Sequence, residues 1–148
     1  MGIYLLLPLS LLVGLSLASQ VGINAQLRSV LTNPLQAAFI SFLVGTIILG
    51  LITLIQGDKW FQPGTLKSIP WWVWCGGILG AFNVAMMLFL APKLGALLLA
   101  ISIMCGQLLA SLVLDQNGWL GYPKVDISAL RAIGAVLVVI GMFLVIKR

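Results

Sequence analysis

Five long apolar stretches, separated by short polar segments, run the length of the chain. A helix needs about 20 residues to cross a hydrocarbon core of about 30 Å, and each stretch has roughly that length. The stretches are too long and too uniformly apolar for the alternating strands of an outer-membrane barrel. The pattern predicts an all-α integral membrane protein, a single domain over residues 1–148 with five transmembrane helices at residues 3–27, 35–55, 71–90, 94–114 and 129–146.

Residues that commonly begin helices stand at the predicted breaks. Asn33 followed by Pro34 is typical of an N-cap with proline at the first helical position. Pro70 and Pro92 are likewise placed at helix starts, and Ser128 can cap the last span. The first stretch lacks the basic n-region of a cleaved signal peptide, so we expect it to remain as a true span.

The basic residues divide evenly between the two sides of the membrane. With an odd number of spans, one face carries Lys59, Lys67, Lys124 and Arg131. The opposite face carries Arg28, Lys93, Lys147 and Arg148. Because lysines and arginines in short loops normally set orientation, this tie predicts insertion in both orientations and pairing of two oppositely oriented copies. Alternatively, all three acidic residues lie on the first face, and net charges of +1 and +4 would favour one fixed orientation.

The large interfacial aromatic residues fall on one face only. They are Tyr4, Trp60, Trp71, Trp72, Trp74, Trp119 and Tyr122. Aromatic belts usually flank both edges of a bilayer, and an antiparallel pair would supply one belt to each edge from a single sequence. A protein of fixed orientation with one-sided tryptophans is the alternative.

A few polar residues inside the spans are the candidate substrate-binding groups. Ser16, Gln20 and Asn24 recur every four residues and so share a face of the first span. The other candidates are Trp72, Asn83 and Gln107. Buried amides without partners are unfavourable, so these side chains should meet protein, water or substrate. Interhelical hydrogen bonding without any ligand is the competing interpretation.

Glycines at helical spacing mark the candidate packing or dimer-contact faces. Small residues allow helix backbones to approach closely within a membrane. The predicted contact residues are Gly76, Gly80, Gly106, Gly134 and Gly141.

The composition argues for a membrane protein and against an enzyme. Hydrophobic residues make up 61% of the chain and charged residues 7%, more apolar surface than a soluble domain of this length could bury. There is no histidine, Cys75 and Cys105 each stand alone, and no carboxylate lies in the middle of a span. We therefore expect no catalytic residue, no metal site and no cofactor. The net charge of +5 is spread over both faces, so we expect no nucleic-acid partner.

Several segments share their order and spacing with a known family. They are Gln20 with Asn24, residues 33–45, residues 71–80, residues 92–95, Gly106 with Gln107, and residues 115–119. Together they resemble the YdcZ-type five-helix family of the drug/metabolite transporter superfamily, over nearly the whole chain. The resemblance implies a multi-pass protein of the bacterial inner membrane. It also implies a pair of five-helix units, or two such units fused into ten helices, and an exporter activity.

The resemblance and the charge tie lead to one functional hypothesis. Two oppositely inserted copies, or this chain with a homologue of opposite orientation, would form a ten-helix inverted-repeat bundle in contact with membrane lipid. We interpret the chain as a transporter that moves a small polar, neutral or weakly anionic metabolite by alternating access. The alternatives are a small multidrug-type exporter, a dual-topology small-anion channel, and a non-transporting membrane assembly subunit.

Overall fold

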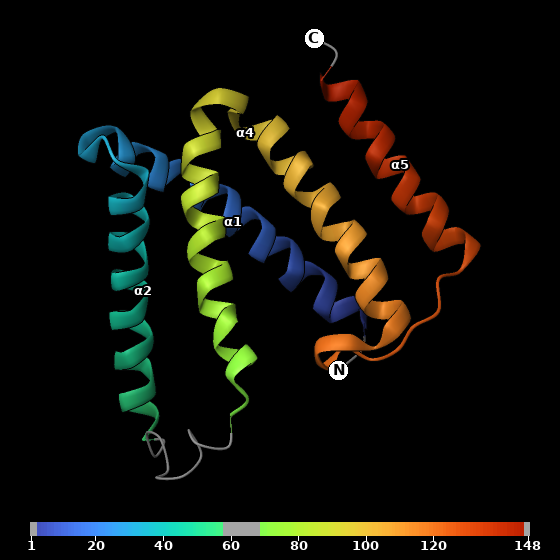
Figure 1. Ribbon diagram of the computed structural model, residues 1–148, viewed down its shortest axis with the longest axis horizontal. Coiled ribbons are helices and arrows are strands. Elements are labelled where there is room, and N and C mark those ends of the chain that lie inside the picture. Colours follow the sequence, from blue (N-terminus) through green and yellow to red (C-terminus); the bar gives the residue numbers. More distant parts are fainter. Residues whose placement is uncertain (1–2, 58–68, 147–148) are drawn as a thin grey trace. The chain divides into compact units, whose positions relative to one another are not determined.

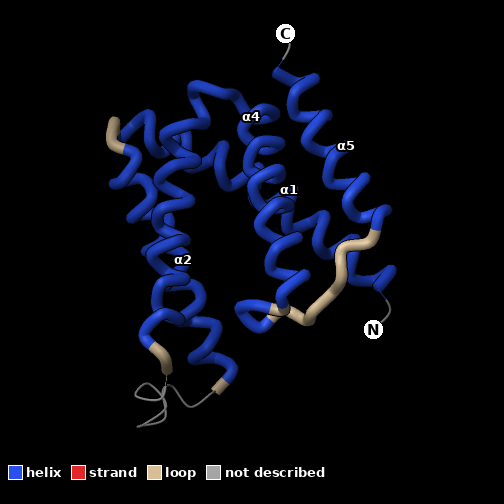
Figure 2. Tube along the Cα trace, turned by 45° about the vertical axis from the view of Figure 1, so that its right-hand side comes forward, coloured by secondary structure: helices blue, strands red, loops and turns tan. Residues whose placement is uncertain are grey.

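The structure, a computed structural model, describes residues 3–57 and 69–146 (Figure 1). Its long helices are α1 (Ile3–Leu31), α2 (Pro34–Gln56), α4 (Cys75–Asn117) and α5 (Ala129–Ile146). Two short 3-10 helices, η1 (Trp71–Trp74) and η2 (Trp119–Gly121), precede and follow α4. Helix makes up almost all of this described part, which contains no strand (Figure 2).

The helices agree with the prediction of an all-helical integral membrane protein. Within the described ranges, four helical stretches are long and apolar enough to cross a membrane: Leu6–Leu31, Pro34–Gln56, Trp71–Asn117 and Ala129–Ile146. Some residues on which the charge and aromatic predictions depend lie outside the described residues, namely Asp58, Lys59, Trp60, Lys67, Lys147 and Arg148, and so does the side chain of Tyr4.

The predicted helix caps are confirmed. The Asn33 side chain accepts a hydrogen bond from the Leu35 amide at 2.8 Å, and Pro34 occupies the first turn of α2. The Ser128 hydroxyl accepts one from the Arg131 amide at 3.3 Å at the start of α5. Each bond satisfies an amide that has no partner within its helix. These local signals explain why the observed starts of α2 and α5 lie within one residue of the predicted starts.

The fourth predicted span and all of the third except its first four residues, which form η1, fall within α4. This helix of 43 residues would be about 64 Å long if it were continuous, which is about twice the thickness of the hydrocarbon core. Gly95 interrupts it, with φ 75° and ψ 169°, a backbone conformation that is essentially restricted to glycine. The interruption differs from the sequence prediction, because Pro92 lies inside the helix and does not begin a new one.

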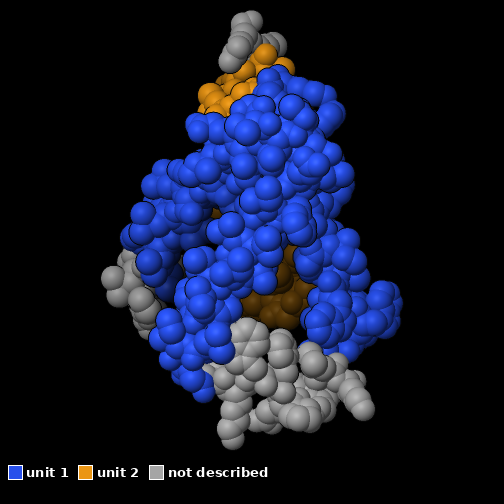
Figure 3. Space-filling model, turned by 90° about the vertical axis from the view of Figure 1, so that its left-hand side faces the viewer, with its two compact units in different colours: residues 1–93 blue, residues 94–148 orange. Residues whose placement is uncertain are grey.

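The chain divides into two compact units close to this interruption, residues 1–93 and residues 94–148 (Figure 3). In the first unit, α1, α2 and the first part of α4 meet around buried Ala37, Ala38, Ala85 and Leu88, with Leu27, Leu31 and Val84 packed against them. Three of the four buried residues are alanines, so the helix backbones can approach closely without large side chains between them.

The second unit joins the last part of α4 to α5. The Cys105 thiol lies 3.8 Å from the Val138 carbonyl, and Ala135 is buried nearby on α5. The connecting segment is tied to the end of α4 by the Val125 amide, which donates to the Asp115 carbonyl at 2.8 Å.

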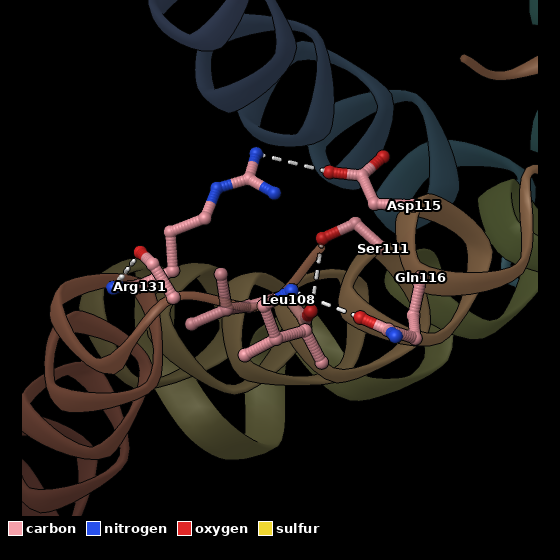
Figure 4. Close-up of polar contacts among 7 residues, drawn as sticks. Leu108, Ser111, Asp115, Gln116 and Arg131 are labelled. Atoms are coloured by element: carbon pink, nitrogen blue, oxygen red, sulfur yellow. Dashed lines mark hydrogen bonds and ion pairs between the residues drawn. The ribbon is translucent and has the colours of Figure 1, made fainter. Parts of the chain in front are cut away.

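Side chains at the end of α4 hold the same connection (Figure 4). The Gln116 Oε1 atom accepts a hydrogen bond from the Ile127 amide at 2.9 Å. Arg131 of α5 forms an ion pair with Asp115 at 3.1 Å. Both partners are partly exposed, so we expect this pair to contribute only about 0.2–1 kcal/mol to stability.

Most large apolar side chains point outward from the chain. Leu11, Ile55 and Leu130 are 70%, 85% and 81% exposed, and Leu88 is the largest fully buried side chain among the described residues. Such a surface is unfavourable in water but is well solvated by lipid hydrocarbon. The described helices therefore need a membrane or further protein around them.

Gly95→Ala should destabilise the protein, because a side chain at this backbone conformation introduces about 1–3 kcal/mol of strain. Gly14→Ala is the matched control, since Gly14 lies in α1 and an added Cβ would meet nothing within 4 Å. The measurement is the monodisperse fraction that survives heating in detergent, followed by size-exclusion chromatography. We expect the midpoint to fall for Gly95→Ala and to stay level or rise for Gly14→Ala. Equal behaviour of the two variants would contradict the strain assigned to Gly95.

Candidate functional site

The polar face of α1 ends at an arginine that sequence reasoning treated only as a loop charge. Arg28 continues the four-residue spacing of Ser16, Gln20 and Asn24. The structure extends α1 to Leu31, so Arg28 lies in the last helical turn. Its side chain is half-buried within the first unit.

Asn24 joins α1 to α2. It is 7% exposed, and its Nδ2 atom donates a hydrogen bond to the Ser41 hydroxyl at 3.0 Å. A hydrogen bond of this kind between membrane helices contributes about 0.6 kcal/mol on average and up to about 1.7 kcal/mol. Asn24 is a predicted binding residue, and its Nδ2 atom is therefore already engaged in a hydrogen bond that stabilises the first unit.

Arg28 joins α1 to α4 through a backbone carbonyl. Its Nη1 atom donates to the Leu88 carbonyl oxygen at 2.9 Å. In a regular helix that oxygen would accept from the amide four residues later, which is at position 92. Pro92 has no amide hydrogen, so it leaves the Leu88 carbonyl without its helical donor. Arg28 supplies the missing donor to the carbonyl of buried Leu88, which explains how α4 continues through Pro92.

An open pocket of about 270 Å³ lies beside this interaction. Its lining consists of Ala25, Arg28, Ser29, Thr32 and Pro92, all from the first unit. The hydroxyls of Ser29 and Thr32 donate to the carbonyls of Gln26 and Leu31, at 2.6 Å and 2.7 Å. Arg28 is thus the only charged group among the described residues of the lining.

The turn at the pocket is held in an unusual conformation. Thr32 has φ 60°, in the left-handed region, and its amide donates to the Arg28 carbonyl at 2.7 Å. For an L-residue this region is unfavourable by about 1–2 kcal/mol, and for a β-branched residue it is rare. Backbone strain of this kind is concentrated at binding sites and switch regions, so it favours a functional role for this end of α1.

The other predicted binding residues are exposed. Ser16, Gln20, Trp72 and Asn83 lie at the surface of the first unit, and Gln107 at the surface of the second. Gln20, Asn83 and Gln107 make no side-chain hydrogen bond to any residue in the described ranges. Trp72 packs edge-on against Trp71, with ring centroids 6.4 Å apart. The structure therefore does not gather these groups into one site within the first unit.

The predicted packing glycines fall into two groups, one in contact with another helix and four in open space. A Cβ atom at Gly80 would lie 3.5 Å from the Phe42 ring, so this glycine does sit at a contact with α2. For the other four a Cβ would meet nothing within 4 Å: Gly76, Gly106, Gly134 and Gly141. Their helix faces are open within the described chain.

No group of three histidine, cysteine, aspartate or glutamate side chains in residues 3–57 and 69–146 is arranged to hold a metal ion. Within those ranges Cys75 and Cys105 are free thiols, in different units. The polar side chains in the pocket lining are the two hydroxyls and the Arg28 guanidinium.

Comparison with known proteins gives one family. The sequence model of the family described as "Putative inner membrane exporter, YdcZ" matches residues 5–144. The chain is also 28% identical over 146 residues to "Inner membrane protein YdcZ" of Escherichia coli (strain K12), an alignment that covers 91% of this chain and 90% of that protein. No solved structure matches the chain.

A double-mutant cycle tests the link between Arg28 and Pro92. Arg28→Ala should lower stability by about 1–3 kcal/mol, because it leaves the buried Leu88 carbonyl without a donor. Pro92→Ala restores an amide hydrogen at position 92, so in that background Arg28→Ala should lower stability by less than about 0.5 kcal/mol. Unfolding is measured in mixed micelles with increasing denaturant. Additive effects of the two substitutions would show that Arg28 does not replace the helical donor.

Proposed function

The chain belongs to the family described as "Putative inner membrane exporter, YdcZ", and from this premise we propose that it moves a small polar, neutral or weakly anionic metabolite by alternating access. It is a multi-pass protein of the inner membrane, and its family is one of membrane exporters. The metabolite class, the mechanism and the antiparallel pairing belong to the proposal.

The exposed amides carry the proposal. Gln20, Asn83 and Gln107 lie on the surface of long apolar helices. An amide in contact with hydrocarbon and without a partner is unfavourable by several kcal/mol, so each should face protein, water or substrate when the chain is in a membrane. Asn24 already has a partner in Ser41, whereas these three amides remain available. Amides donate and accept hydrogen bonds, which suits a polar ligand without a strong charge.

A second copy of the chain would give these amides an enclosed environment. If the two parts of α4 on either side of Gly95 each cross the membrane, the chain has five spans and its termini lie on opposite sides. The four-against-four division of basic residues then gives little preference for either orientation. Two copies in opposite orientations form an inverted repeat, an arrangement in which transporters commonly bind substrate near the midplane.

Open glycine faces support the same pairing. Gly76, Gly134 and Gly141 have room for close approach of another helix, because no described atom lies near where their Cβ atoms would be. Small residues at such positions are typical of helix contacts in membranes. In the proposed dimer Trp72, which is 55% exposed, forms an aromatic wall beside the amides.

Transport in liposomes tests the role of the amides. Purified protein is reconstituted into vesicles that contain a mixture of metabolites, and mass spectrometry measures which compounds leave. Gln20→Leu, Asn83→Leu and Gln107→Leu should each reduce the rate about tenfold, the effect of losing one hydrogen bond of about 1.4 kcal/mol. Gln26→Leu is the matched control, because Gln26 is an exposed glutamine near the end of the same helix as Gln20. Unchanged rates in all three variants would refute the proposed site, and currents resolvable in a bilayer would indicate a channel.

Reporter fusions test the orientation of the chain. Green fluorescent protein at the C-terminus fluoresces in the cytoplasm, and alkaline phosphatase is active in the periplasm. We expect both signals at comparable levels, because the basic residues favour neither side. Two further lysines after Arg148 would change the balance to six against four and should abolish most of the phosphatase signal. Activity of a single reporter in the unmodified protein would rule out a homodimer of opposite orientations.

A further inference from the structure

Arg28, in the pocket at the end of α1, has N–H donors that its bond to the Leu88 carbonyl does not use. A guanidinium group carries N–H donors on all three of its nitrogens, and the Leu88 carbonyl engages only Nη1 of Arg28. The same side chain lines the open pocket of about 270 Å³. The remaining donors of Arg28 can therefore bond to a group that enters this pocket.

Arg28 has no carboxylate partner among the described residues of its unit. The described residues of the first unit, 3–57 and 69–93, include no aspartate or glutamate. A half-buried cation without a carboxylate partner is an unfavourable arrangement unless an anion can approach it. This pocket thus has the electrostatics of an anion site.

Helix dipoles do not reverse this conclusion. The carboxyl end of α1 carries roughly half a negative charge, but α2 begins at Pro34 and brings roughly half a positive charge to the same turn. These two contributions approximately cancel, which leaves the full charge of Arg28. Lys93 follows Pro92 in the sequence but does not line the pocket, and its Nζ atom lies 3.5 Å from the centre of the Phe89 ring.

The position of the pocket across the membrane indicates what kind of anion it binds. Arg28 lies in the last turn of the apolar span Leu6–Leu31, where a transmembrane helix reaches the layer of lipid head groups. Arginine binds phosphate with paired N–H bonds, which makes it the preferred side chain for this group. We propose that the Arg28 guanidinium binds a phosphate group in this pocket, carried either by a membrane phospholipid or by a soluble phosphate compound. Pro92 contributes an apolar wall to the pocket and no hydrogen-bond donor. This site is additional to the proposed amide site, and its test requires no transport.

The experiment separates the charge of Arg28 from its structural bond. Arg28→Ala alone exposes the Leu88 carbonyl and can fail to fold, so the comparison uses Pro92→Ala with and without Arg28→Ala. In the Pro92→Ala background the helix supplies its own donor to Leu88, and Arg28 retains its charge at the pocket. Lys93→Ala is the control for loss of a positive charge that does not line the pocket.

Thermal unfolding in neutral detergent is measured with three additions: short-chain phosphatidylglycerol, short-chain phosphatidylcholine, and inorganic phosphate against sodium chloride of equal ionic strength. We expect phosphatidylglycerol or phosphate to raise Tm by about 3 °C or more in the unmodified protein, in Pro92→Ala and in Lys93→Ala. The double variant should lose this increase.

Each outcome of this measurement bears on the proposal. A response to phosphatidylglycerol but not to inorganic phosphate identifies the lipid as the source, and the reverse result identifies a soluble compound. Equal responses of Pro92→Ala and the double variant, or no greater response to either anion than to phosphatidylcholine and chloride, would overturn the phosphate site.

Discussion

One hydrogen bond, from Arg28 to the Leu88 carbonyl, allows the first unit to keep its shape. In hydrocarbon no water replaces a lost backbone partner, so a proline inside a membrane helix leaves a carbonyl that some other group must satisfy. Here the donor comes from another helix, and its arginine is brought into reach by the buried alanines between α1, α2 and α4. The Leu88 carbonyl must have a donor, and this one constraint therefore links the close packing of the helices, the continuity of α4 and the position of the positive charge.

Much of the fold was predictable because its signals are local. The caps at Asn33 and Ser128 and the long apolar stretches depend on neighbouring residues, and the structure reproduces both caps and has four long apolar helical stretches in its described residues. The end of the third predicted span depended on a distant residue. Pro92 is a sound local reason to end a helix, but Arg28, 60 positions earlier in the chain than Leu88, removes the penalty. The interruption falls at Gly95 instead, since only glycine adopts that backbone conformation readily.

The candidate site was predictable to a smaller extent. Helical spacing identified the polar face of α1, and within it the structure engages Asn24 with Ser41. The same spacing would have included Arg28, but a charged residue beyond the end of a predicted span is ordinarily read as a loop residue that orients the protein. Its structural role depends on the proline in α4, a relation between two elements that single-helix periodicity does not contain. Gln20 and Gln107 have no side-chain partner among the described residues, and the partners that we propose for them belong to a second copy, which a single chain does not specify.

The order of the two partners along the chain has a consequence for synthesis in the cell. The donor at position 28 emerges from the ribosome well before the acceptor at position 88, and membrane segments are inserted from the N-terminus onward. When the proline-containing helix enters the bilayer, α1 is already there with its arginine at the head-group layer. The free carbonyl of Leu88 can then be satisfied as soon as the helix docks. If the proline were in α1 and the arginine in α4, the carbonyl would instead remain unpaired in the membrane until the arginine had been synthesised.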